Sequence, residues 1–173
     1  MSLREIHTYP DPVLRKKAEP VTKFDVELQQ LVKDMAQTMY DAPGIGLAAP
    51  QIGVSKQVVV MDLSTEEEDN QLMVLINPEI LSGEGSQTDE EGCLSVIDLR
   101  AKVKRFSNIV VRAQDPEGNT NEFEADEWFA RVIQHEVDHL NGVLFLDRIS
   151  SLKRALYKKK RKKQLQKEGQ KAA

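Results

Sequence analysis

The chain has 173 residues, with 24 Lys or Arg against 28 Asp or Glu and a formal charge of −4. This length allows one compact domain with a buried core, and no apolar run approaches the length of a membrane span. The charge is uneven, because residues 151–173 contain ten Lys or Arg and one Glu, which leaves −13 on residues 1–150. We therefore expect an acidic body, 1–150, followed by a basic C-terminal segment, 151–173.

Apolar periodicity predicts the main elements. Residues 25–40 carry apolar side chains at helical spacing, and Pro43 with Gly44 ends that helix. A second helix is expected from an N-cap at Asp126 to a C-cap at Asn141 and Gly142. Strands are predicted from short β-rich runs at 57–61 and 72–76 and from strand-like segments at 96–103 and 108–114. The turn signal DPEG at 115–118 leads from the last of these into a further predicted strand at 120–124. Antiparallel strands around a helix make an α+β fold.

Between the first helix and the first strand, the chain reads GIGLAAPQ at residues 44–51. Glycine lets the backbone approach another chain or a ligand closely, and Gln51 offers an amide donor without charge. The segment is not a phosphate loop, since it lacks the Gly-Lys-Ser/Thr ending. A plain connector without a function explains this segment equally well.

Cys93 is the only cysteine, so no internal disulfide can form, and residues 1–7 do not resemble a cleavable leader. We therefore expect a cytoplasmic protein in which this thiol stays reduced. A reduced thiol is able to bind a metal ion as thiolate, although a free cysteine is more often a small buried apolar residue.

The predicted second helix contains the sequence HEVDH. At about 100° per residue, His139 lies roughly 40° from His135 and one turn along the axis, so both rings can reach one ion. Glu136 and Asp138 flank the pair about equally, and only the known mechanics of H-E-x-x-H favour Glu136 as proton acceptor. Two surface histidines among solvated charges are the alternative. With Cys93 as a third ligand, one coordination position stays open, as in catalytic sites.

Three segments resemble peptide deformylase in sequence and order: GIGLAAPQ at 44–51, EGCLS at 91–95 and QHEVDHL at 134–140. Together with YPDPVLR at 9–15 and NGVLF at 141–145, the resemblance covers residues 6–149. It implies a metallohydrolase that removes the formyl group from the N-terminal formylmethionine of nascent polypeptides, with residues 1–150 as catalytic domain. The metal ligands are then Cys93, His135 and His139. The divalent ion is expected to be iron(II) natively, with zinc, nickel or cobalt able to replace it.

The resemblance also implies roles for the residues around the ion. Glu136 accepts a proton from the attacking water, while the Gln51 side-chain amide and the Leu94 backbone N–H hold the developing oxyanion. The formyl-methionyl peptide is expected to bind as an added β-strand through main-chain hydrogen bonds. The backbone expected to pair with it is that of Ile45, Gly46 and Gly92. The methionine side chain needs an apolar pocket, for which the candidates are Ile45, Leu94, Trp128 and Val132.

Several residues near this pocket have two interpretations. Trp128 is as readily an ordinary core residue. Arg131 either covers the pocket with its stem or faces solvent. Arg100 either contacts carbonyl groups of the peptide or is a surface charge. Ile97 stands where the family commonly has proline, so we expect the edge of the binding strand to pair differently here.

The basic segment 151–173 combines good helix formers with dense positive charge and predicts a C-terminal helix that is partly disordered, after about residue 166. Such a helix suits a phosphate backbone, and the resemblance points to ribosomal RNA near the peptide exit. A solvated helix without a partner is the alternative. We expect no membrane partner, and we expect a monomer.

Two other classes of function fit parts of the chain. A zinc endopeptidase shares the histidine helix but normally takes its third ligand from a later residue rather than from an upstream cysteine. A non-enzymatic RNA-binding module would use the basic tail together with a purely structural metal, and an open coordination position argues against it.

Overall fold

The computed structural model describes residues 2–172. Its α-helices are α1 (Val26–Asp41), α2 (Glu127–Leu140) and α3 (Ser151–Ala172), and 3-10 turns cover Pro12–Arg15, Ala49–Ile52 and Phe145–Arg148. Its strands are β1 (Gly46–Ala48), β2 (Val58–Met61), β3 (Met73–Glu84), β4 (Gln87–Cys93), β5 (Val96–Arg105), β6 (Asn108–Gln114) and β7 (Thr120–Asp126). The predicted α+β class is therefore correct.

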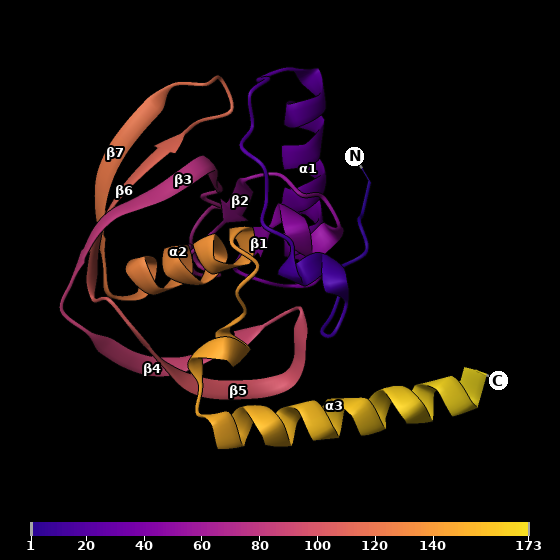
Figure 1. The fold of residues 1–173 in the computed structure, drawn as a ribbon. Coiled ribbons are helices and arrows are strands. Elements are labelled where there is room, and N and C mark those ends of the chain that lie inside the picture. Colours follow the sequence, from indigo (N-terminus) through magenta and orange to yellow (C-terminus); the bar gives the residue numbers. More distant parts are fainter. Residues whose placement is uncertain (1, 173) are drawn as a thin grey trace.

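The strands form two antiparallel sheets that enclose α2. One sheet has the order β1-β2-β3-β6-β7, and the other is the hairpin of β4 and β5. Figure 1 shows α2 between the curved large sheet and this hairpin, with α1 outside the large sheet near β1 and β2. The catalytic candidates on α2 thus lie in the interior of the molecule.

Strand β2 explains how two helices share one sheet. Val58 and Val60 pack into the cluster that contains the apolar face of α1, whereas Val59 and Met61 pack into the cluster that contains α2. Successive strand residues point to opposite faces, so a strand covered on both faces is apolar at every position. All four residues of β2 are buried for this reason.

Both ends of α2 lie where the sequence predicts them. Asp126 is the N-cap with an extended backbone, and Asn141 is the C-cap. Gly142 follows with a φ of 73°, and a Cβ at this position would lie 2.5 Å from the Arg15 carbonyl oxygen. A glycine is therefore needed both for the turn and for the close approach of the two chain segments.

Three elements differ from the prediction. β4 has the polar sequence QTDEEGC and was not predicted, because its pairing with β5 rather than its apolar content makes it a strand. The segment predicted to be a connector contains β1 and a 3-10 turn, Ala49–Ile52. β3 continues past residue 76 through Asn77 and Pro78, where its register with β6 shifts. A register shift of this kind accommodates proline inside a strand.

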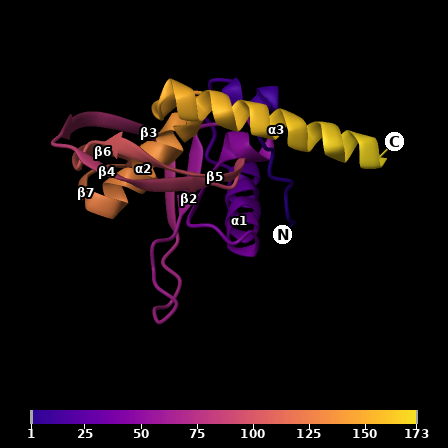
Figure 2. The same ribbon diagram turned by 90° about the horizontal axis from the view of Figure 1, so that it is seen from below.

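Helix α3 lies along β5, and its C-terminal turns project beyond the rest of the molecule in both views (Figures 1 and 2). It is continuous to Ala172, past the point after which the sequence predicts partial disorder. The division of the chain at residue 150 stays a prediction. Among residues 2–172, none of the helices combines the length and the apolar character that a membrane crossing requires.

Candidate active site

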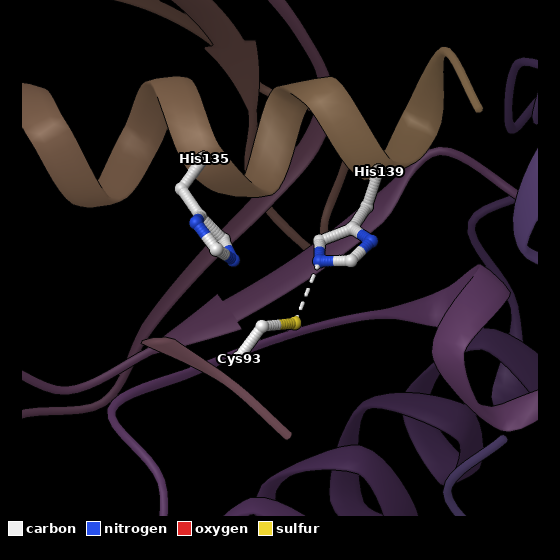
Figure 3. A group of neighbouring side chains, drawn as sticks. All are labelled: Cys93, His135 and His139. Carbon is white, nitrogen blue, oxygen red and sulfur yellow. Dashed lines mark hydrogen bonds between the residues drawn. The ribbon is translucent and has the colours of Figure 1, made fainter. Parts of the chain in front are cut away.

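The structure brings the single thiol and two imidazoles together (Figure 3). His135 and His139 stand one turn apart on α2, with ring centroids 5.2 Å apart, and Cys93 is the last residue of β4. The Cys93 Sγ lies 3.4 Å from the Nε2 of His139. One ligand atom from each of the three residues lies within 4.8 Å of the others. This spacing allows the three atoms to bind one ion.

The chemistry of this donor set fits a divalent transition-metal ion. Burial and the neighbouring His135 lower the pKa of His139 well below its usual range, so its ring is neutral. Burial also acts to lower the pKa of His135, but contacts with Cys93 and Glu91 outweigh it and raise the pKa well above its usual value. Metal ligands must be deprotonated, so binding of an ion here releases a proton.

A carboxylate that the sequence analysis missed orients His135. Glu91 is buried, and its Oε1 lies 2.9 Å from the Nδ1 of His135. The other ring nitrogen, Nε2, is thereby left for the ion. Arg105 donates two hydrogen bonds to Glu91, of 2.8 and 2.9 Å, and Arg131 donates another. Burial by itself raises the pKa of Glu91, but Arg105 and His135 outweigh it and lower that pKa to about 2.

The sequence contains a signal for the role of Glu91 beside His135. Glu91 and Cys93 are two residues apart, and side chains at that spacing in a strand point to the same face. A histidine that binds a metal usually donates its second ring N–H to a carboxylate. The signal was missed because β4 was not recognised as a strand.

The structure separates the two acidic residues that helical geometry left equivalent. Asp138 lies 2.6 Å from an Arg105 nitrogen and forms two hydrogen bonds, of 2.6 and 2.8 Å, with Arg148. Its carboxylate is thus neutralised by two guanidinium groups. Glu136 lies on the other flank, beside Gly46 of β1, where a Cβ would be only 2.7 Å from the Glu136 Oε1. Glycine at this position leaves room for the carboxylate.

Glu136 has the properties of a proton acceptor that works near neutral pH. Its Oε2 is buried and has no hydrogen-bond partner within residues 2–172. Burial raises the pKa of Glu136 to about 7, although His135 acts to lower it. A carboxylate whose pKa lies near the working pH is suited to general acid–base catalysis.

The orientation of Gln51 is determined by its carbonyl oxygen. The Oε1 of Gln51 accepts a 2.9 Å hydrogen bond from the backbone N–H of Ala48. The amide nitrogen therefore points the other way, to 3.0 Å from the Ser95 Oγ and 3.7 Å from the Cys93 Sγ. Gln51 is buried, so its donor group is held at the metal ligands rather than in solvent.

A cavity of about 520 Å³ reaches Cys93, His135 and Glu136 from the surface. Every residue predicted to bind substrate lines it: Ile45, Gly46, Gly92, Leu94, Arg100, Trp128, Arg131 and Val132. Trp128 is 48% exposed, so the alternative that it is a core residue is wrong.

The two arginines of the cavity differ in what they can offer a ligand. Arg131 is 1% exposed and bonded to Glu91 and to the Val103 carbonyl, so the alternative that it faces solvent is wrong. Its guanidinium is part of the Glu91 network. Arg100 is an exposed side chain at the cavity mouth, and a Cβ on Gly92 would lie 2.9 Å from its guanidinium.

Comparisons with known proteins agree with this geometry. A sequence model of the polypeptide deformylase family matches residues 3–155. A protein named peptide deformylase from Desulfotalea psychrophila is 57% identical over 164 residues, which cover 94% of this chain and 97% of that protein. The crystal structure of a peptide deformylase from Legionella pneumophila matches with a TM-score of 0.87 and 44% identity, and covers 95% of this chain and 98% of that one.

A second similar structure contains a peptide. It is a Met-Ala-Ser bound class I type b peptide deformylase from Acinetobacter baumannii. It matches with a TM-score of 0.81 and 34% identity, and covers 86% of this chain and 99% of that one.

Proposed function

This chain belongs to the polypeptide deformylase family and is a metallohydrolase that removes the N-formyl group from nascent polypeptides, and on that premise we propose which residues carry out the reaction. One observation supports the assignment above all. Two of the three proposed ligand residues, Cys93 and His135, line one cavity that opens to the surface together with Glu136, and the Nε2 of the third, His139, lies 3.4 Å from the Cys93 Sγ.

Cys93, His135 and His139 hold one divalent ion, iron(II) natively, with zinc, nickel or cobalt able to take its place. When bound, the ion supplies Lewis-acid activation of water and of the formyl carbonyl. Glu91 keeps the His135 ring in the orientation and tautomer that bind it. Metal analysis of anaerobically purified protein tests the identity of the ion, and activity that falls in air supports iron(II), because a thiolate beside iron is prone to oxidation.

Glu136 accepts the proton of the water that attacks the formyl carbon, and later delivers it to the leaving amine nitrogen. The Gln51 amide and the Leu94 backbone N–H donate to the carbonyl oxygen as negative charge develops on it. Cleavage of the C–N bond gives formate and a free N-terminus.

The peptide runs along Ile45, Gly46 and Gly92, with the methionine side chain among Leu94, Trp128 and Val132 and with Arg100 and Arg131 at the cavity wall. The Met-Ala-Ser peptide bound to the Acinetobacter baumannii relative supports a site for at least the first residues of a chain. Release of formate from formyl-Met-Ala-Ser, followed by mass spectrometry of the product, tests this function. Internal cleavage of a longer peptide would indicate an endopeptidase instead.

Replacement of Gln51 by methionine removes the amide donor at nearly constant volume. We expect kcat/KM for formyl-Met-Ala-Ser to fall by about 10² to 10³, the usual effect of losing one oxyanion donor. Steady-state kinetics at full metal occupancy measure it, with Gln29→Met on the exposed surface of α1 as the matched control. A loss below tenfold would remove Gln51 from the oxyanion site.

We further propose that the exposed lysines of α3 bind ribosomal RNA near the peptide exit, and that the enzyme acts in the cytoplasm as a monomer. The support is the charge of residues 151–173, ten Lys or Arg against one Glu, and the projection of α3 from the body (Figure 2). RNA binding through phosphate contacts weakens steeply as salt concentration rises.

Four exposed lysines of α3 allow a direct test: Lys158, Lys159, Lys162 and Lys163. Their joint replacement by glutamine should weaken ribosome binding and reduce its dependence on salt, because fewer counterions are released. Hydrolysis of formyl-Met should be unchanged. Sedimentation with ribosomes at several salt concentrations measures the effect, and equal affinity of the wild type and the variant would contradict the proposal.

A further inference from the structure

One wall of the cavity is an irregular segment of β5. Glu91 pairs with Ala101 and Cys93 pairs with Val96, so Gly92 alone faces the four residues 97–100. We call residues 97–100 the β5 bulge. Asp98, inside it, has a φ of 61°, in a region that few residues other than glycine adopt. Asp98, Leu99 and Arg100 line the cavity. A backbone of this shape persists only where other contacts hold it.

Helix α3 supplies such contacts from the side of the bulge away from the cavity. The Tyr157 hydroxyl donates a 2.9 Å hydrogen bond to the carbonyl of Ile97, and Gln164 lies 3.3 Å from the Asp98 carboxylate. Tyr157 is buried, in the same apolar cluster as Val96. Figure 1 shows α3 running beneath β5. In a regular edge strand, a carbonyl in this position is unpaired and available to an added peptide strand. Here the Ile97 carbonyl already accepts the hydrogen bond from Tyr157.

A second buried side chain of α3, Arg161, is connected to the bulge indirectly. Its Nη1 donates a 3.4 Å hydrogen bond to Gln164, which contacts Asp98, and its Nε is linked through Tyr9 to Ser95, just before the bulge. The Arg161 Nε donates a 2.9 Å hydrogen bond to the carbonyl of Tyr9. The Tyr9 N–H in turn donates a 2.7 Å bond to the carbonyl of Ser95. Arg161 is 5% exposed although it belongs to a helix rich in exposed lysines. An arginine buried in this way acts as an anchor rather than as part of the basic surface.

We propose that Tyr157 and Arg161 are positioning residues that hold the β5 bulge in the shape that binds the peptide beyond its formyl-methionyl residue. The inference deepens the proposed function and rests on it. The proposed metal ligands and the groups proposed to act on the formyl carbonyl all lie outside residues 97–100, and Cys93 pairs with Val96, the residue directly before the bulge. The bulge faces Gly92, along which the peptide runs. Loss of the anchors therefore affects how an extended peptide binds and leaves the chemical step intact.

Tyr157→Phe and Arg161→Met test this proposal, because each keeps the apolar part of the side chain and removes the anchoring hydrogen bond. For formyl-Met-Ala-Ser we expect KM to rise about 2- to 10-fold in each variant, the loss expected for one or two hydrogen bonds, with kcat nearly unchanged. For formyl-methionine, which lacks the residues that the proposal places beside the bulge, both constants should equal those of the wild type. Leu156→Ala, on the exposed side of the same helix, is the control.

Three results would overturn the proposal. They are an unchanged KM for formyl-Met-Ala-Ser, an equal change for both substrates, and the same change in Leu156→Ala. Thermal unfolding and metal content of each variant show whether it is folded and loaded, so that the kinetic comparison is made between intact enzymes. A wild-type enzyme that releases no formate from either substrate would contradict the proposed function and not the role of α3.

Discussion

Replacement of Glu136 by glutamine is expected to lower kcat for formyl-Met-Ala-Ser by about 10² to 10⁴, the usual contribution of a general acid–base residue. The amide has the shape of the carboxylate and fits beside Gly46, but it cannot accept the proton of the attacking water. Because Glu136 is not one of the three ligand residues, the metal content of the purified variant should equal that of the wild type. Steady-state kinetics and metal analysis on the same preparation measure both effects.

Glu124→Gln provides the matched control, since Glu124 is an exposed residue of β7. It should behave as the wild type in both measurements. Near-normal turnover of a metal-loaded Glu136→Gln enzyme would show that another group takes the proton. Asp138 is a poor replacement, because Arg105 and Arg148 already bind its carboxylate.

Replacement of Glu91 by glutamine is expected to have two effects. It removes the carboxylate that pairs with buried Arg131, while Arg105 keeps only Asp138. Breaking a buried ion pair from one side costs about 3–5 kcal/mol in the free energy of unfolding. It also removes the group that orients His135, which should weaken metal binding about 10- to 100-fold. Chemical denaturation of the metal-free protein measures the first effect, and competition with a chelator measures the second.

The exposed neighbour Asp89, changed to asparagine, should alter neither quantity. A Glu91→Gln protein that is destabilised but binds metal with unchanged affinity would limit Glu91 to the arginine network. The wild-type ion pair also has a pH dependence. Folding lowers the pKa of Glu91 to about 2, so the ionised Glu91 side chain contributes fully to the free energy of unfolding at any pH above the usual pKa of a glutamate. This contribution is lost as the pH falls through about 2.

Features that depend on local sequence were predicted from it. α1 and α2 begin and end close to their predicted boundaries, because capping residues and apolar periodicity act over one or two helical turns. β2 and β6 were found because their own residues have strand character, and β7 because the turn signal at 115–118 leads from β6 into it. The candidate ligands Cys93, His135 and His139 were found because the chain has one thiol and three imidazoles, two of them one helical turn apart.

Features that depend on pairing between distant segments were decided by the tertiary structure alone. β4 is polar and becomes a strand through its register with β5, and this register delivers Glu91 to His135. Contacts with distant segments also decide whether Glu136 or Asp138 is the candidate proton acceptor. The two carboxylates are equivalent on an isolated helix, and they differ because β1 places a glycine beside one while β5 places Arg105 beside the other. Sequence periodicity describes the face of an element, but the neighbour of that face is known only when the elements pack together.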